Sequence, residues 1–154
     1  SSGAMFLAVG MLTYRFRSRL IKDYGGIATR MPLLASFFML FAMSNVGLPG
    51  TSGFVGEFMI ILSAMQASFW ITTIAASTLI LSTSYTLYLY KRVFFGEITN
   101  PLVEASGDIH GFEKLVFILL ALAIILLGVY PAPLLTIMHT SIDSILHWSL
   151  QTKL

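Results

Sequence analysis

The chain has 154 residues, of which 56% are hydrophobic and only 10% are charged. Its mean hydropathy of +0.85 excludes an ordinary water-soluble globular protein. Because it contains no cysteine, disulfides, thiolate metal sites, iron–sulfur clusters and thiol catalysis are excluded within it. The net charge of +2 is small and the basic residues are not interleaved with aromatic ones, so no nucleic-acid partner is expected. Lipid is the natural solvent, and the composition predicts an all-α integral membrane protein.

Residues 1–14 are predicted to be the end of a truncated membrane span. The sequence begins Ser1-Ser2-Gly3 inside an apolar run, without an initiator Met, a signal peptide or a charged leader. We therefore expect the chain to be a piece of a longer protein, with a further N-terminal part before Ser1.

The charged residues fall in clusters, because a charge inside hydrocarbon is energetically expensive. One cluster covers residues 15–30 and a second covers residues 91–114, and Glu57 is the only acidic or basic residue between them. A helix needs about 20 residues at 1.5 Å each to cross roughly 30 Å of hydrocarbon. The apolar runs between the charges therefore predict further helices at residues 31–66, 69–90 and 115–136.

The run at residues 31–66 is too long for one straight span, since a helix of this length would measure about 54 Å. We expect it to be broken at residues 47–53, because proline removes a backbone donor and glycine loosens the backbone. The residues assigned to this break are Gly47, Pro49, Gly50, Gly53 and Gly56.

The break allows two topologies. A hairpin between two spans would put the basic residues before and after it on opposite faces of the membrane, whereas one discontinuous helix would put them on the same face. Because cytoplasmic loops carry the excess of Lys and Arg, we favour the discontinuous helix, with both basic clusters facing the cytoplasm or the matrix.

Glu57 is the leading candidate for a functional residue. A broken membrane helix frees backbone groups that only protein or a water-filled cavity can satisfy, and Thr51 and Ser52 would add hydration at that point. A carboxylate early in the resumed helix would meet the freed amides and the positive end of the helix dipole. Desolvation favours the neutral carboxyl, while amides, water or a nearby Lys favour the ionised one. We therefore expect Glu57 to act as a proton relay; the alternative is a Glu that only bonds to a neighbouring helix.

Two other patterns are open to more than one interpretation. The hydroxyl-rich run at residues 69–90 could line a hydrated path or, as we expect, bond neighbouring helices together. His139, Asp143 and His147 are spaced to share one helix face and could hold a metal. However, residues 137–150 are typical of a short amphipathic helix in the membrane interface, and we expect no metal site. With no phosphate-binding glycine motif and no nucleophile beside a base, a self-contained enzyme is not expected.

The segment NVGLPGTSGFVGEF, residues 45–58, closely resembles the antiporter-like membrane subunits of respiratory complex I. Four further stretches are similar to this family in the same order: SSGAMFL at 1–7, YGG at 24–26, RVFFG at 92–96 and GVYP at 128–131. The resemblance implies a fragment of an antiporter-like helix bundle with about four transmembrane helices, one of them discontinuous. It makes residues 1–154 the C-terminal part of a proton-translocating domain, and it implies that Glu57 marks one type of subunit, whose siblings carry Lys there.

The resemblance also implies a function: a proton-translocating membrane subunit of NADH:quinone oxidoreductase, which couples electron transfer elsewhere in the complex to proton pumping. The chain would belong to an enzyme without holding a redox site, since NADH, FMN, iron–sulfur clusters and quinone are bound by other subunits. Its partners would be the other membrane subunits, above all the sibling antiporter-like ones, together with the N-terminal part of its own subunit and the lipid of a bacterial or mitochondrial inner membrane. The alternatives are a subunit of a multi-subunit cation/proton antiporter and a structural piece of the bundle that does not titrate.

Overall fold

The structure is a computed structural model that describes residues 1–98, 100–138 and 142. All regular structure in these ranges is helical, without a strand, which confirms the all-α prediction. The elements in chain order are α1 (Ser2–Phe16), η1 (Ile21–Asp23), α2 (Ile27–Arg30), α3 (Pro32–Asn45), α4 (Ser52–Ala67), α5 (Phe69–Phe94), α6 (Pro101–Glu104) and α7 (Gly111–Val129).

Helix α7 is long and apolar enough to cross a membrane, and α3 and α4 are shorter apolar helices. Helix α5 has 26 residues, so at 1.5 Å per residue it is roughly 39 Å long, but its many hydroxyls lower its hydropathy. Helix α7 ends at Val129, seven residues before the predicted end of the last span at 136. The reason is Pro131, which has no N–H to continue the helix. Residues 132–138 are again helical.

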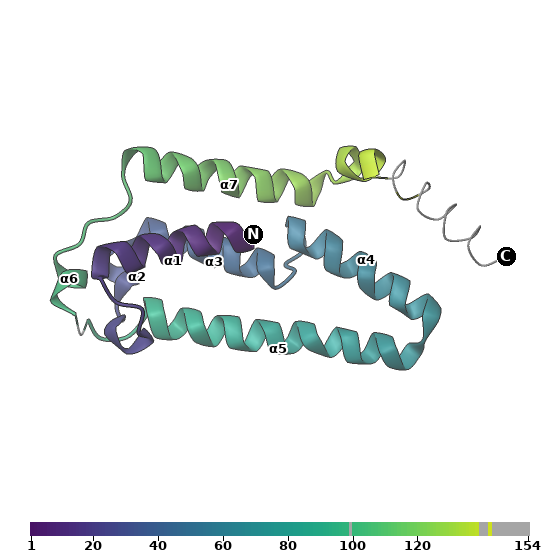
Figure 1. Ribbon diagram of the computed structural model, residues 1–154, viewed down its shortest axis with the longest axis horizontal. Helices are drawn as coiled ribbons and strands as arrows, with labels where there is room; N and C mark the ends of the chain where they lie inside the picture. Colours follow the sequence, from purple (N-terminus) through teal and green to yellow (C-terminus); the bar gives the residue numbers. More distant parts are fainter. Residues whose placement is uncertain (99, 139–141, 143–154) are drawn as a thin grey trace.

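The long helix α5 decides the topology of the break. Figure 1 shows α3 and α4 running one after the other in the same general direction, while α5 returns alongside both. The end of α5 lies beside the start of α3, where the Tyr90 hydroxyl donates to the carbonyl oxygen of Ala35 at 3.1 Å. The first half of α5 lies beside α4, and Glu57 and Thr78 line one cavity there. Residues 31–66 are therefore one discontinuous helix, and a hairpin is excluded.

The buried core lies where α1, α3, α5 and α7 meet. Aromatic rings fill it: Phe38 lies against Phe94 with ring centroids 4.9 Å apart, and Phe41 lies against Phe117 at 5.8 Å. Small residues on α1, such as Ala8, let that helix approach the core closely. Helix α4, by contrast, contributes no buried residue to this core, so the two halves of the discontinuous helix have different environments.

The end of the bundle that carries the basic clusters is held together by polar contacts. The Asp108 carboxylate accepts hydrogen bonds from the backbone N–H groups of Leu33 at 2.8 Å and Leu34 at 3.2 Å, so it caps the N-terminus of α3 from 74 to 75 residues away. The guanidinium of Arg15, at the end of α1, pairs with Glu113 at the start of α7 at 2.5 Å. These contacts join three helices at one end.

Candidate functional site

Helix α3 ends in a Schellman motif. Gly47 has φ 84°, its N–H donates to the carbonyl oxygen of Ser44 at 3.2 Å, and the Leu48 N–H donates to that of Met43 at 3.0 Å. Pro49 follows, where the chain can no longer continue as a helix. Glycine is needed at position 47 because other residues rarely adopt this left-handed conformation.

The break is shorter than predicted, because α4 already begins at Ser52. Gly53 and Gly56 therefore lie inside α4 and not in the break. Gly53 has a different role there: a Cβ on it would overlap the carbonyl oxygen of Ser44, so glycine lets α4 start directly against the end of α3. Gly56 meets nothing within 4 Å and has no such role. Gly50 has φ 90°, which requires glycine in the turn itself.

The Glu57 side chain points back over the break. A Cβ on Gly47 would overlap its Oε2 atom, so the carboxylate lies directly against the Gly47 backbone. Oε2 is buried and has no hydrogen-bond partner among the described residues. A buried carboxylate oxygen without a donor is rare and needs an explanation, such as water or a functional role.

The surroundings of Glu57 differ from the predicted ones in one respect. Its side chain does not bond to the amides freed at the start of α4, because it lies beyond the first turn of that helix, which contains no acidic residue. Glu57 instead lines a cavity of about 170 Å³ between α4 and α5, and Thr78 is the other polar side chain in the lining. This volume is sufficient for several water molecules at about 30 Å³ each.

Thr51 and Ser52 lie at the start of α4, but they do different things. The Thr51 hydroxyl is buried and donates to the carbonyl oxygen of Leu48 at 2.7 Å, which closes the turn and leaves α4 without a side-chain cap. Ser52 lines two cavities, of about 470 Å³ and 340 Å³, on the side of α4 that faces α7. Ser52 is thus the hydroxyl that is available for hydration.

Helix α7 packs against the break through Gly128. A Cβ on Gly128 would overlap the backbone of Thr51 and the carbonyl oxygen of Gly50. Sequence reasoning did not assign Gly128 to the site; a glycine near the end of a strongly apolar helix was the only signal available. Its role depends on contact between residues 77 positions apart, which no local pattern encodes.

A second group of polar residues, also missed from the sequence, lies where α1 begins. The hydroxyls of Ser1 and Ser44 are 2.6 Å apart, and the Ser2 hydroxyl donates to the side-chain oxygen of Asn45 at 2.7 Å. Ser44 and Asn45 are adjacent polar residues at the end of an apolar helix, and only Val46 separates them from the Schellman glycine, Gly47. That position was the available signal.

The hydroxyls of α5 do not bond helices together as predicted. Six of them donate to carbonyl oxygens three or four residues earlier in their own chain: Thr72, Thr73, Ser77, Thr78, Thr83 and Ser84. This internal bonding satisfies a hydroxyl in lipid without any partner helix. A hydrated path along α5 is therefore restricted to hydroxyls such as Thr78 that also line a cavity.

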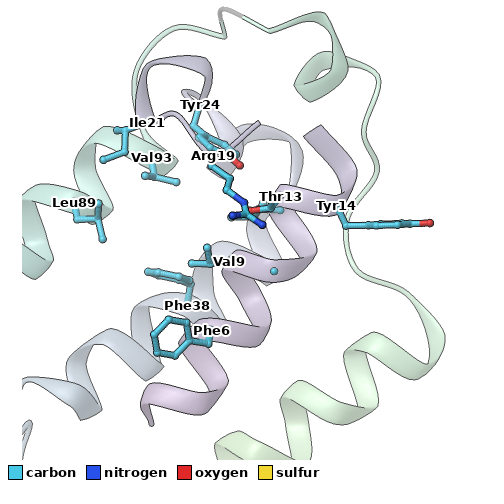
Figure 2. A pocket seen from close by; sticks show the side chains of 12 residues that line it. Phe6, Val9, Thr13, Tyr14, Arg19, Ile21, Tyr24, Phe38, Leu89 and Val93 are labelled. Atoms are coloured by element: carbon cyan, nitrogen blue, oxygen red, sulfur yellow. The ribbon is translucent and has the colours of Figure 1, made fainter. Parts of the chain in front are cut away.

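A further cavity, of about 730 Å³, lies between α1, α3 and α5. Figure 2 shows mostly apolar side chains around it, with the Arg19 guanidinium extending to Thr13 and the Tyr14 ring pointing away. None of its lining residues comes from α4 or from the break. This cavity is therefore separate from the surroundings of Glu57.

The described ranges contain no group of three or more His, Cys, Asp or Glu that could hold a metal ion. His139, Asp143 and His147, where we expected no metal site, and most of the predicted amphipathic segment 137–150 lie outside the residues that the structure describes. The functional groups of the site are thus one carboxylate, several hydroxyls and exposed backbone at a break inside a membrane helix, an arrangement typical of membrane transport proteins.

The comparison with known families agrees with this class. Residues 1–83 match the family described as NADH:quinone oxidoreductase/Mrp antiporter, transmembrane, and the chain belongs to this family. It is a membrane chain of a family whose solved members form multi-subunit assemblies. These findings confirm the antiporter-like fold class.

Individual relatives point more closely to complex I. The chain is 48% identical over 131 residues to NADH-quinone oxidoreductase subunit M of Rhodobacter capsulatus, an alignment that covers 85% of this chain and 26% of the relative. It is 40% identical over 144 residues to NADH-ubiquinone oxidoreductase chain 4 of Marchantia polymorpha, covering 94% of this chain and 29% of the relative. The chain thus spans less than a third of the length of these relatives.

Two solved structures share the fold. Respiratory complex I from Thermus thermophilus with bound NADH matches with a TM-score of 0.71 and 36% identity, over 82% of this chain and 26% of that one. The Mrp complex from Dietzia sp. DQ12-45-1b matches with a TM-score of 0.72 and 23% identity, over 86% of this chain and 33% of that one. At that lower identity the second match shows the fold alone.

Proposed function

We propose that the chain is the C-terminal part of a proton-translocating membrane subunit of NADH:quinone oxidoreductase, of the type called subunit M in bacteria and chain 4 in mitochondria. The relatives named above support this assignment because all of their identities exceed that of the Mrp complex. The observation that carries the mechanism is the carboxylate of Glu57, which lies against the break with one buried oxygen that has no partner among the described residues.

Glu57 is the proton relay in this proposal. Its carboxylate faces a cavity large enough for water on the α4–α5 side, and it lies against a turn whose backbone is not fully paired within the helix. The ionised form gains from water, while the neutral form gains from the apolar surroundings. Small changes in nearby charge would therefore shift a proton on or off Glu57 and couple this site to the rest of the complex.

The proposal assigns no redox group to this chain. NADH, FMN, iron–sulfur clusters and quinone would be bound by other subunits, and electron transfer there would drive the pumping. The partners of this chain would be the sibling antiporter-like subunits, the N-terminal part of its own subunit and the lipid of a bacterial or mitochondrial inner membrane. Both basic clusters, which the fold brings to one end, would face the cytoplasm or the matrix.

The second candidate is a subunit of a multi-subunit cation/proton antiporter, and the shared fold with the Mrp complex favours it. The two functions would differ in their energy source, because an antiporter subunit needs no electron transfer. A proton flux that stops when NADH oxidation stops would support complex I. A flux that continues, driven by a cation gradient alone, would support the antiporter.

The test is NADH-driven proton uptake by membrane vesicles that carry Glu57→Gln in the full-length subunit, normalised to the amount of assembled complex. We expect at least about a tenfold loss of pumping, because a positioned proton-transfer group typically contributes about 10²–10⁴-fold. Glu97→Gln is the matched control, since Glu97 is an exposed carboxylate beyond the end of α5. Normal pumping by assembled Glu57→Gln complex would leave only a structural role for this residue.

A further inference from the structure

Thr51 lies where the break ends, directly before Ser52, the first residue of α4. It is buried, with a relative exposure of 3%. A threonine in this N-cap position usually accepts a hydrogen bond from a backbone N–H in the first turn of the helix. Here the hydroxyl donates to the carbonyl oxygen of Leu48 at 2.7 Å, and α4 has no side-chain cap. The hydroxyl therefore stabilises the turn before α4 and not the start of the helix.

The carbonyl oxygen of Leu48 accepts two hydrogen bonds from Thr51. The backbone N–H of Thr51 donates to it at 3.1 Å, in addition to the hydroxyl. The N–H of Leu48 in turn donates to the carbonyl oxygen of Met43 at 3.0 Å, near the end of α3. Thr51 is thus connected through Leu48 to the end of α3, and the turn around Pro49 is closed by hydrogen bonds at both of its ends.

The position of the Glu57 carboxyl group depends on both of the elements that this turn connects. The backbone of Glu57 belongs to α4, whereas its Oε2 atom lies against the backbone of Gly47, in the motif that ends α3. Gly47 directly precedes Leu48, the acceptor of the Thr51 hydroxyl. A rotation of α4 about the turn would move the carboxyl group relative to Gly47 and change the access of water to Oε2. The hydrogen bond from Thr51 restrains this rotation.

Helix α7 contacts the same residue through Gly128. A Cβ atom on Gly128 would overlap the Cα atom of Thr51 and the carbonyl oxygen of Gly50. Both are backbone atoms, so they can move away only if the turn itself moves. Because Gly128 has no side chain, α7 can pack directly against Thr51. The turn is therefore supported by a helix that contains neither the break nor Glu57.

We propose that Thr51 and Gly128 are positioning residues for Glu57, because together they fix the turn between α3 and α4 against which the carboxyl group lies. The proposal rests on the proton-translocating function proposed above and deepens it by naming the residues that set the surroundings of the relay. Neither residue passes protons to Glu57. Thr51 lines none of the four cavities described above, and Gly128 has no side chain to titrate.

A merely structural role makes a different prediction. The close contact of Gly53 with the carbonyl oxygen of Ser44 also holds α4 against α3, so the discontinuous helix should survive the loss of one hydrogen bond. A structural role predicts less assembled complex, with normal pumping by the complex that remains. A positioning role predicts impaired pumping by assembled complex and a shifted pH profile, because this profile reports the essential proton-exchanging groups.

The experiment measures protons pumped per NADH oxidised, over a range of pH, by assembled complex that carries each variant in the full-length subunit. Valine resembles threonine in shape but has no hydroxyl, so Thr51→Val removes the side-chain hydrogen bond to Leu48. We expect pumping to fall by about threefold, the effect of one lost hydrogen bond, and the pH profile to shift. Thr51→Ser keeps the hydroxyl and should restore both the pumping and the pH profile.

Gly128→Ala tests the support from α7. We expect a loss of about threefold or more, because the added Cβ displaces the backbone of Thr51, together with a shifted pH profile. The double variant with Thr51→Val should lose less than the product of the two single losses, since both changes act on one turn. Gly56→Ala is the matched control: it adds the same Cβ beside Glu57 but meets nothing within 4 Å, so its pumping and pH profile should be normal.

The outcomes separate the positioning role from the function on which it rests. Normal pumping by assembled Thr51→Val complex, with Glu57→Gln inactive, would overturn the positioning role and leave Glu57 as the relay. An equal loss in Thr51→Val and Thr51→Ser would also overturn it, because the hydroxyl would then have no part in the effect. Normal pumping by Glu57→Gln would overturn the proposed function, and the positioning role with it. Should Gly128→Ala fail to assemble, the two Thr51 variants decide, since they add no bulk to the turn.

Discussion

The polar groups at the two ends of α3 differ in whether they have hydrogen-bond or ion-pair partners among the described residues. At its start, the backbone N–H groups of Leu33 and Leu34 are capped by Asp108, and the nearby Arg15 is paired with Glu113. At its end, the carboxylate of Glu57 lies against the turn with a buried oxygen that has no donor in the described part of the chain. The first end is a set of paired polar and charged groups, and the second is a carboxyl group whose buried oxygen has no partner among the described residues.

The polar groups at the start of α3 thus have a structural role, whereas the carboxyl group at its end is the candidate functional group. Paired groups gain little from changing their protonation state, because each ionised form is already compensated. A carboxyl group without such compensation responds to changes in nearby charge and hydration, and proton transfer requires this response. Three substitutions, taken from the largest expected effect to the smallest, test whether the contrast is real.

The largest effect is expected from Gly53→Ala. The added Cβ would overlap the Ser44 carbonyl oxygen, a backbone atom that cannot rotate away, so α4 would be pushed off the end of α3. Overpacking of this kind costs about 1–3 kcal/mol, and we expect less assembled complex and a lower melting temperature. Gly56→Ala, three residues along the same helix, meets nothing within 4 Å and should be neutral or stabilising by up to about 1 kcal/mol. Equal losses in the two variants, measured by native gel and thermal inactivation, would contradict the close contact at Gly53.

An intermediate effect is expected from Asp108→Ala. It removes the cap from α3 and leaves the N–H groups of Leu33 and Leu34 without their acceptor, at a cost of about 1 kcal/mol. Asp108→Asn retains one acceptor oxygen and should recover most of the lost stability. Thermal unfolding of the purified complex measures both variants, and proton pumping per NADH should remain unchanged in each. A loss of pumping without a loss of stability would mean that this end of α3 also takes part in proton transfer.

The smallest effect is expected from Glu113→Gln. The Arg15–Glu113 pair is short, but its side chains are 23% and 41% exposed, and ion pairs with this exposure contribute up to about 1 kcal/mol. The loss should shrink further at high salt, because salt screens exposed charges. Glu104→Gln, which breaks a longer and more exposed pair with Arg30, serves as the control and should not change the melting temperature. A loss of several kilocalories per mole in Glu113→Gln would show that this pair is far better shielded than its exposure indicates.

The sequence alone determined the features that arise from composition and local chemistry. The hydropathy of the sequence indicated a membrane protein. Because burying a charge in hydrocarbon is costly, the charged residues fall in clusters separated by long apolar runs. The Gly47, Pro49 and Gly50 pattern identified the break, because these residues change the backbone wherever they occur. The isolation of Glu57 inside an apolar run identified the candidate relay. The hydroxyls of α5 were misjudged, because bonding to the same helix and to another helix leave the same sequence signal.

Only the tertiary structure decided which groups meet. The caps and contacts that define the two ends of α3 join residues far apart in the chain: Asp108 with Leu33, Gly128 with Thr51, and Ser1 with Ser44. Gly53 and Gly56 look alike in the sequence. Gly53 allows α4 to approach the end of α3 closely, whereas Gly56 lies in the same helix without a close neighbour. They differ only in what lies opposite, which depends on how the helices pack. The break and its carboxylate are thus local properties of this chain, whereas their surroundings are properties of the packed bundle.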